Sequence, residues 1–243
     1  MKRILTLLVL TICFAAISAQ AADVTVITEI APPLSFEENG KLTGASTELV
    51  EEIMRRTGKV YPIEVQPWAR GYHLAQTDPN VALFSTTRTE ARENMFKWVG
   101  PLAVTQWVFW AKAGSGISIS SLDDAKKVES IATYKDDAKE QLLKDKGFTN
   151  LDSSANLATN LKKLMAGRNA LWIAGYKEGQ LVAKENGFDP SKLEKVFVVK
   201  EVKLYVAFSK STPDSIVNEW QKAFDSMEAD GFVKKVNEKW ANR

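Results

Sequence analysis

A short polar segment follows an apolar run near the middle of the first half of the chain. Val81–Phe84 is expected to form a buried strand, and Ser85 and Thr87 come soon after it. Small polar residues at the end of a buried strand, near a helix start, form a suitable cradle for an anion. Arg92 follows, and its planar guanidinium group matches the geometry of a carboxylate. Without further information, the residues favour a different role, in which Arg92 pairs with Glu90 or Glu93 on the surface.

A second candidate site is the segment Pro67–Tyr72, at the carboxyl end of the expected strand Val60–Val65. Trp68 and Tyr72 offer flat apolar walls for a ligand, and Arg70 offers a positive donor. A structural role explains the same residues as well, because Trp68 would then seal a lobe and Arg70 would cap a helix.

The beginning of the chain indicates export. Met1–Arg3 is basic, Ile4–Ile17 carries no charge, and Ala19–Ala21 has the small-residue pattern of a cleavage site. This order is typical of a secretory signal peptide, which we predict over residues 1–21, and it predicts a periplasmic protein. The apolar run is shorter than the roughly 20 residues that a membrane-spanning helix needs, which disfavours an anchor.

Removal of this leader changes the chemistry that the chain can carry. The mature chain would hold thirty basic and thirty acidic residues and no basic stripe, so nucleic acid is a poor partner. The only cysteine, Cys13, would leave with the leader, and His73 is the only histidine. We therefore expect no disulfide, no cofactor and no metal site, and no triad that depends on histidine.

The order of apolar patterns indicates an α/β fold built from two similar cycles. A first strand–helix–strand cycle leads to an apolar strand at Trp107–Trp110, and a second cycle leads to another at Leu204–Phe208, before two amphipathic helices. We predict two lobes, each a mainly parallel sheet flanked by helices, joined by two hinge strands. The first lobe would hold residues 22–108 and 206–243, and the second lobe residues 109–205. Such lobes bind a small ligand in the cleft between them and close on it.

Local signals predict the individual elements. A helix is expected between Gly44 and Gly58. The second cycle is expected to contain helices and strands over these ranges: helices at 121–127, 136–146 and 157–165, and strands at 130–133, 170–173 and 195–199.

Several segments, in this order, resemble one known family, the family 3 bacterial extracellular solute-binding proteins, which are the periplasmic components of polar amino-acid ABC transporters. The segments that carry the resemblance are Lys41–Gly44 with Glu48–Val50, Ser85–Arg92, Phe96, Gly100–Leu102 and Tyr205–Lys210. Together they cover nearly the whole mature chain, and they imply the two-lobed periplasmic binding fold.

The resemblance implies roles for residues of the first lobe. Arg92 would form a paired hydrogen bond with a ligand carboxylate, with Ser85 and Thr87 as further partners. Phe36 occupies the place where the family has an aromatic lid over the ligand, although a single loop phenylalanine also suits ordinary packing. Trp68 would form part of the wall around the rest of the ligand.

The second lobe departs from the family pattern at two places. Gly175 stands where amino-acid binders present an aspartate to the ligand ammonium, and Tyr134–Asp137 replaces the family's Gly-Thr. Acidic residues there would repel an anionic ligand unless Lys135 offsets them. Tyr134 and Trp172 offer aromatic surface for the pocket, and Trp172 suits a buried strand equally well.

We therefore expect a monomeric periplasmic protein that captures a small carboxylate-bearing ligand for an ABC permease. The ligand would be an amino acid, whose ammonium meets Glu178 or a carbonyl group, or a less polar, aromatic carboxylate. A ligand-sensing receptor partner without transport is the alternative. A dehydratase-like enzyme on the same fold would use Glu178 or Asp136 as acid or base. No paired carboxylates at a defined spacing and no activated nucleophile support it, so we expect no catalysis.

Overall fold

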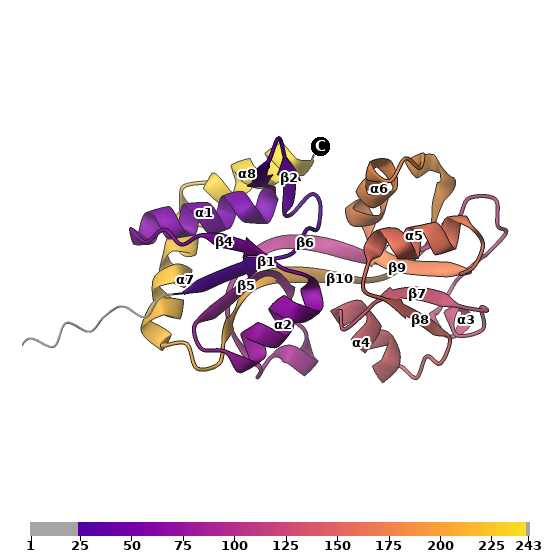
Figure 1. Cartoon of the computed structure of the whole chain (residues 1–243), viewed down its shortest axis with the longest axis horizontal. Helices are drawn as coiled ribbons and strands as arrows, with labels where there is room; N and C mark the ends of the chain where they lie inside the picture. Colours follow the sequence, from indigo (N-terminus) through magenta and orange to yellow (C-terminus); the bar gives the residue numbers. More distant parts are fainter. Residues whose placement is uncertain (1–23, 242–243) are drawn as a thin grey trace, which may run out of the picture.

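The structure is a computed structural model that describes residues 24–241. The predicted leader and its cleavage site lie outside these residues. Figure 1 shows two lobes side by side, each with helices packed around strands, joined by two long strands. Within the described part of the chain, no helix is both long and apolar enough to cross a membrane. The predicted two-lobed α/β architecture is confirmed.

The first lobe contains both ends of the described chain. Its elements are β1 (Thr25–Thr28), β2 (Phe36–Glu38), β3 (Lys41–Thr43), α1 (Ala45–Thr57), β4 (Ile63–Val65), α2 (Trp68–Thr77), β5 (Val81–Thr87), the short 3-10 helix η1 (Glu90–Arg92), α7 (Asp214–Ala229) and α8 (Phe232–Ala241). Strand β1 pairs in parallel with β4 and with β5. Helices α1 and α7 pack against each other, and their apolar stripes enclose one core with this sheet.

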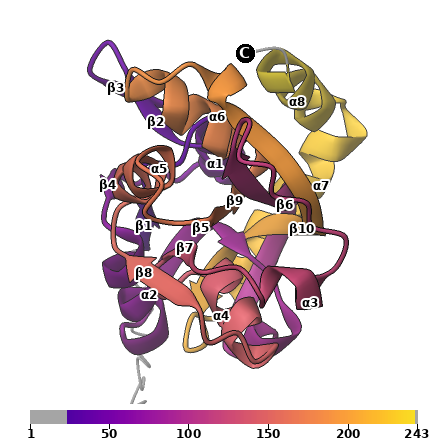
Figure 2. The same cartoon turned by 90° about the vertical axis from the view of Figure 1, so that its right-hand side faces the viewer.

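The second lobe is built from the middle of the chain. Its elements are α3 (Leu122–Ala125), β7 (Ile131–Tyr134), α4 (Ala138–Asp145), β8 (Leu151–Ser154), α5 (Leu157–Met165), β9 (Leu171–Gly175), α6 (Tyr176–Glu185) and the 3-10 helix η2 (Pro190–Lys192). Strand β7 pairs in parallel with β8 and β9. In Figure 2, which views the molecule from this lobe's side, α6 and α8 both lie towards the top.

Two glycines set the limits of α1, as predicted. A side chain at Gly44 would place its Cβ 2.3 Å from the main-chain oxygen of Leu34, so only glycine fits before the helix. Gly58 ends the helix in the left-handed conformation, with φ of 70°. The observed helix, Ala45–Thr57, fills the predicted interval between them.

The two lobes share one hydrogen-bonded sheet because the hinge strands are long. Strands β6 (Phe96–Lys112) and β10 (Leu193–Ser209) pair antiparallel along their length, in a sheet of order β4-β1-β5-β10-β6-β9-β7-β8. The prediction of short separate strands at 107–110, 195–199 and 204–208 was wrong. Register shifts interrupt the pairing, which breaks the alternation of side chains that marks a long strand in the sequence.

The pairing of the hinge strands changes from one lobe to the other. Residues 107–110 of β6 pair with β9 of the second lobe, whereas residues 204–208 of β10 pair with β5 of the first lobe. The lobe boundaries at 108/109 and 205/206 stay a prediction.

Several short elements differ from the predictions. The helix expected at 121–127 is a single turn, α3, and the strand expected from Val60 begins only at Ile63. Helix α6, strand β8 and the β2–β3 hairpin were not predicted, and no bounds were predicted for α2. These elements are short or follow directly on a strand, so they carry too few apolar repeats to be recognised.

Candidate functional site

A cavity of about 560 Å³ lies between the two lobes, with the hinge strands as its third side. Its described lining comes from the loop after β1, from β5 and the end of β9, from the starts of α1, α2, α4 and α6, from the hinge strands and from α8. Three of the predicted site residues, Trp68, Ser85 and Thr87, line it. Lining residues lie at or just after the carboxyl ends of β1, β5, β7 and β9, which is the usual place for a ligand site in an α/β fold.

The lobes touch each other directly beside this cavity. The indole Nε1 of Trp68 in the first lobe donates a hydrogen bond of 2.9 Å to the main-chain oxygen of Asp136 in the second. The hydroxyl of Tyr134 in the second lobe donates one of 3.0 Å to Glu29 Oε2 in the first. The cleft is therefore closed in this conformation, and the protein's own groups hold it closed.

Arg92 takes part in this contact between lobes. Its Nε donates to Gln141 Oε1 at 3.1 Å, and its guanidinium stacks on the rings of Tyr72 and Trp68, 4.5 and 5.3 Å from their centres. Only 1% of Arg92 is exposed, it does not line the cavity, and burial lowers its pKa. Its Nη1 has no hydrogen-bond partner among the described residues. The surface pair expected from the residues alone does not form; Arg88 pairs with Glu93 instead.

Ser85 also carries an unsatisfied polar atom. Its Oγ is buried and has no hydrogen-bond partner within residues 24–241, although the residue lines the cavity. Its φ of 60° lies in the left-handed region, which residues other than glycine rarely adopt. A buried hydroxyl without a partner costs about 1–3 kcal/mol, so a ligand that hydrogen-bonds to it would recover part of that cost.

Four charged side chains form a cluster at the cavity, and only Glu178 and Asp137 were connected with the ligand from the sequence. We call Glu29, Asp137, Lys139 and Glu178 the charged cluster; all four line the cavity. Lys139 Nζ lies 3.0 Å from Asp137 Oδ1 and 3.9 Å from Glu178 Oε2. Two carboxyl groups therefore share one buried ammonium group, Glu29 adds a third carboxyl group, and the cluster has more acidic than basic groups.

The electrostatic environment of the cluster differs for each member. Burial, and then the negative charges of Asp137 and Glu178, raise the pKa of Glu29 to about 8. Burial acts to lower the pKa of Lys139, but the nearby carboxylates outweigh it and raise that pKa above its ordinary value. At pH 7, Lys139 is charged and Glu29 is mostly protonated.

Gly175 and Glu178 form a local pair where β9 passes into α6. Glu178 Oε2 accepts a hydrogen bond of 2.8 Å from the Gly175 main-chain nitrogen, which caps the helix. A Cβ on residue 175 would lie 3.3 Å from that same oxygen, tighter than most Cβ contacts. The glycine thus leaves room for the Glu178 carboxylate at the wall of the cavity.

The other predicted site residues do not line the cavity. Trp172 is fully buried in the core of the second lobe, because its strand is covered on both faces, and Arg70 is exposed on α2. Phe36 packs edge-on against Trp240, with ring centres 5.5 Å apart, and Trp240 itself is a lining residue. Tyr134 contributes through its hydroxyl bond to Glu29.

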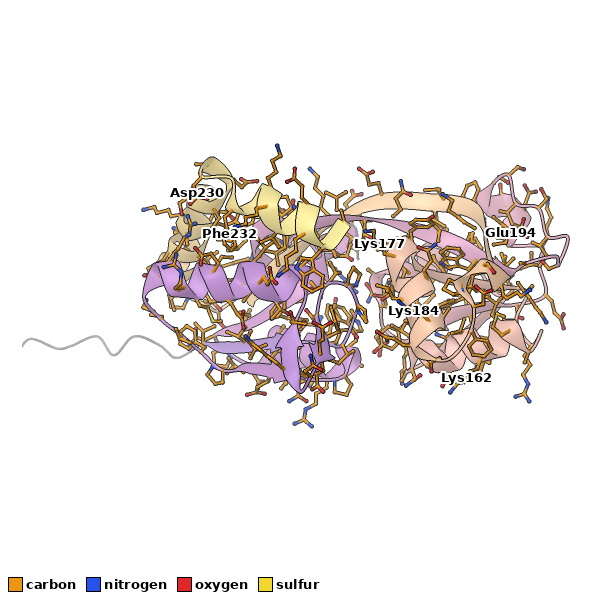
Figure 3. The ribbon with its side chains drawn as sticks, turned by 90° about the horizontal axis from the view of Figure 1, so that it is seen from above. Lys162, Lys177, Lys184, Glu194, Asp230 and Phe232 are labelled. Atoms are coloured by element: carbon orange, nitrogen blue, oxygen red, sulfur yellow. The ribbon has the colours of Figure 1, made fainter. Side chains whose placement is uncertain are left out.

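The end of α8 closes one side of the cavity. Lys177, at the start of α6, donates hydrogen bonds to the main-chain oxygens of Trp240 and Ala241, the last described residues of α8. Figure 3 shows Lys177 between α8 and the second lobe. All three residues line the cavity, so this is a further contact between the lobes.

Glu29 and Lys139 were not predicted as site residues, because the members of the cluster are distant in the chain. Glu29 directly follows the buried strand β1, at the edge of the sheet where Ser85 and Thr87 were expected. Asp137 caps α4 and Lys139 lies in its first turn. The position of Glu29 after a buried strand was the one signal available in the sequence. No cluster of three or more potential ligands suited to a metal ion occurs within residues 24–241.

Comparison with known proteins agrees with this geometry. The sequence profile of the bacterial extracellular solute-binding proteins, family 3, matches residues 24–243. The chain belongs to this family. None of the curated protein sequences compared with this family 3 protein matches it.

Solved structures show the same fold at low sequence identity. A histidine kinase sensor domain with similarity to periplasmic binding proteins has a TM-score of 0.82 and 18% identity, covering 90% of this chain and 96% of its own. A mutant of ArgBP from T. maritima has a TM-score of 0.79 and 16% identity, covering 90% and 95%. An ancestral arginine-binding protein bound to arginine has a TM-score of 0.74 and 22% identity, covering 90% and 99%. The family 3 protein therefore shares its two-lobed fold with proteins that bind small ligands.

Proposed function

We propose that this family 3 protein captures a small ligand carrying both a carboxylate and an ammonium group, and that it delivers the ligand to an ABC permease from the periplasm. The observation that carries the proposal is the interlobe cavity. Its volume of about 560 Å³ lies within the range of about 300–1,000 Å³ that is usual for small-molecule sites.

Ser85 and Thr87 support the position of the ligand carboxylate. Ser85 Oγ is a buried hydroxyl without a partner among the described residues, and Thr87 lines the cavity beside it on β5. Arg92 would supply positive charge from behind Trp68. It would contact the carboxylate through its unpartnered Nη1 only after the Trp68 ring moves, because Trp68 lines the cavity and Arg92 does not.

The charged cluster favours an ammonium group on the ligand. Its single lysine is already shared between Asp137 and Glu178, so a ligand that brings only negative charge would meet repulsion. A ligand ammonium would add a second positive charge to three carboxyl groups. Glu178 is the member best suited to hold it, since Gly175 leaves space beside its carboxylate. This favours an amino acid over an aromatic carboxylate without an amine.

Family membership supports the role in binding and transport. The matched family consists of extracellular solute-binding proteins. A sensing role would use the same cavity, and the fold occurs in a sensor domain as well. Deletion of the gene would distinguish the two roles. Loss of ligand uptake would support import, and intact uptake with loss of a cellular response to the ligand would support sensing.

The ligand proposal is tested with matched triplets of compounds. The protein starting at residue 22 is screened by thermal shift against each amino acid, its deaminated carboxylate and its decarboxylated amine. Binding raises the melting temperature by mass action. We expect the amino acid of one triplet to give a clear shift and both analogues to give much less. Equal shifts from the amino acid and its deaminated carboxylate would contradict the ammonium site.

Two variants locate the groups once a ligand is found. Glu178→Gln keeps an acceptor for the Gly175 nitrogen and removes the charge, and we expect affinity to fall by tenfold or more. Glu194→Gln removes an exposed carboxylate elsewhere in the second lobe and serves as the control, with unchanged affinity. Isothermal titration calorimetry measures both. An unchanged affinity in Glu178→Gln would remove this residue from the site.

A further inference from the structure

Glu29 is a carboxyl group of the first lobe that is enclosed by groups of the second. It lies in the loop after β1, and its Oε2 accepts the hydrogen bond from Tyr134 at the end of β7. Its described neighbours along the chain, Thr28 and Ile30, carry no charge. The charged groups that shift its pKa in this conformation, Asp137, Glu178 and Lys139, belong to the opposite lobe.

The charged groups that face Glu29 come from two helices. Asp137 and Lys139 lie at the start of α4, and Glu178 lies in the first turn of α6. Lys139 lies 3.0 Å from Asp137 and 3.9 Å from Glu178, so its positive charge mainly compensates these two carboxylates. Lys177 also lines the cavity, but it donates to the carbonyl groups of α8. Glu201 adds a further acidic group from β10.

Closing the lobes thus brings a third carboxyl group to two carboxylates that share one ammonium group. We infer that closure of this protein takes up a proton at Glu29, so that the closed form gains population as the pH falls. Opening the cleft exposes Glu29 to water and separates it from Asp137 and Glu178. A protonated Glu29 still keeps an acceptor oxygen for the hydroxyl of Tyr134, so the interlobe hydrogen bond survives protonation.

The direction and range of the pH effect follow from the two environments. In this closed conformation the pKa of Glu29 is raised from its ordinary value of 4.5 to about 8, and we expect the open form to restore the ordinary value. Between these values, closure binds up to one proton, so the closed-to-open ratio rises by up to about tenfold per pH unit as the pH falls. From pH 9 to pH 6 the ratio would increase by roughly 100-fold. Above pH 8 the ratio becomes insensitive to pH, because Glu29 is ionised in both forms.

The test measures closure without any ligand, so it does not depend on the proposed function. The protein starting at residue 22 has no cysteine. Lys41→Cys on β3 and Lys184→Cys on α6 therefore provide a unique pair of exposed sites, one on each lobe, for spin labels. Double electron–electron resonance measures the populations of the short and long distances between pH 5 and pH 9. We expect the short distance to gain population as the pH falls from 9 to 6.

Two variants distinguish Glu29 from a general effect of charge. Glu29→Gln mimics the protonated carboxyl, keeps an acceptor for Tyr134, and should stay closed with no pH response over this range. Glu194→Gln removes an exposed carboxylate outside the cavity and should keep the response of the wild type. A pH-independent wild type, or a Glu29→Gln protein that responds like the wild type, would overturn the inference, as would a loss of the response in Glu194→Gln.

A measurement on the unaltered protein covers the case in which Glu29→Gln does not fold. Carbon-13 NMR of labelled glutamate side chains follows the Glu29 carboxyl carbon directly. A midpoint well above 4.5 in the closed form supports the inference, and an ordinary midpoint contradicts it. Thermal-shift screening of ligands is a separate measurement. The ligand proposal can therefore fail while proton-linked closure stands, and proton-linked closure can fail while the ligand proposal stands.

Discussion

The indole nitrogen of Trp68 lies 2.9 Å from the main-chain oxygen of Asp136, and this hydrogen bond joins the two lobes beside the cavity. Trp68 also stacks on Tyr72 and lies close to the guanidinium of Arg92. One side chain thus forms a wall of the cavity, packs on the buried arginine of its own lobe and holds the opposite lobe.

Replacing Trp68 by phenylalanine should loosen the closed form. The ring contacts are largely kept, but the interlobe hydrogen bond is lost, which removes about 0.5–1.5 kcal/mol from closure. The closed-to-open ratio should fall by about two- to tenfold, measured with the same spin-label pair. Trp98→Phe is the matched control, because Trp98 Nε1 donates to Glu93 within the first lobe. Equal effects of the two changes on closure would contradict the prediction.

Ser85→Ala should affect ligand binding and stability in opposite directions. The change removes a buried hydroxyl without a partner, so the free energy of unfolding without ligand should stay equal or rise by up to about 1 kcal/mol. Ligand affinity should fall by about tenfold. Urea unfolding and calorimetry measure the two quantities. Thr86→Val is the control. It loses a hydrogen bond to the Leu83 carbonyl, so the free energy of unfolding should fall while ligand affinity stays unchanged. Unchanged affinity in Ser85→Ala would show that the hydroxyl does not contact the ligand.

Lys139→Met should destabilise the protein through the loss of a buried positive charge. The change leaves the carboxylates of Asp137 and Glu178 buried without a cation, at a cost of about 3–5 kcal/mol in unfolding free energy at neutral pH. Urea unfolding at neutral pH measures this loss. Lys144→Met removes a mostly exposed partner of Glu140 and should cost less than about 1 kcal/mol.

Glu52 should contribute to stability at neutral pH through its two arginine partners on α1. Hydrogen bonds from Arg55 and Arg56 lower its pKa from 4.5 to about 2. A lowered pKa in the folded state stabilises the protein above pH 4.5, and this contribution disappears as the pH falls towards 2. Glu52→Gln should therefore lose about 1–2 kcal/mol at pH 7 and almost nothing at pH 2. Glu51→Gln, at an exposed position, is the control in urea titrations. A loss of stability in Glu52→Gln that is the same at pH 7 and pH 2 would contradict the role of the two arginine partners.

The sequence predicted the architecture better than it predicted the length of the strands. Gly44 and Gly58 limit α1 because their conformations are local properties, which a sequence pattern contains. The extent of β6 and β10 depends on pairing between segments about a hundred residues apart, and their register shifts conceal the alternation. Short elements that start directly after a strand, such as α6, were missed for the same reason, since tertiary contacts rather than periodicity define them.

The site was predicted in part. Ser85, Thr87 and Trp68 line the cavity because each follows or adjoins a strand end at one edge of the sheet, and strand ends can be predicted. The positions of Arg92 and Trp172 depend on which face of an element is covered, and this follows only from the packing of the whole lobe. The charged cluster draws on three distant segments, and its closest ion pair, Asp137–Lys139, carries no recognisable motif.

The contact between Lys177 and the end of α8 bears on how the protein is handled. Because Trp240 and Ala241 line the cavity and accept hydrogen bonds from the opposite lobe, an affinity tag fused after residue 243 would begin two residues beyond a cavity wall. We expect such a tag to disturb the contact between Lys177 and the end of α8. A tag placed ahead of β1, at the far end of the first lobe in Figure 1, leaves this contact intact.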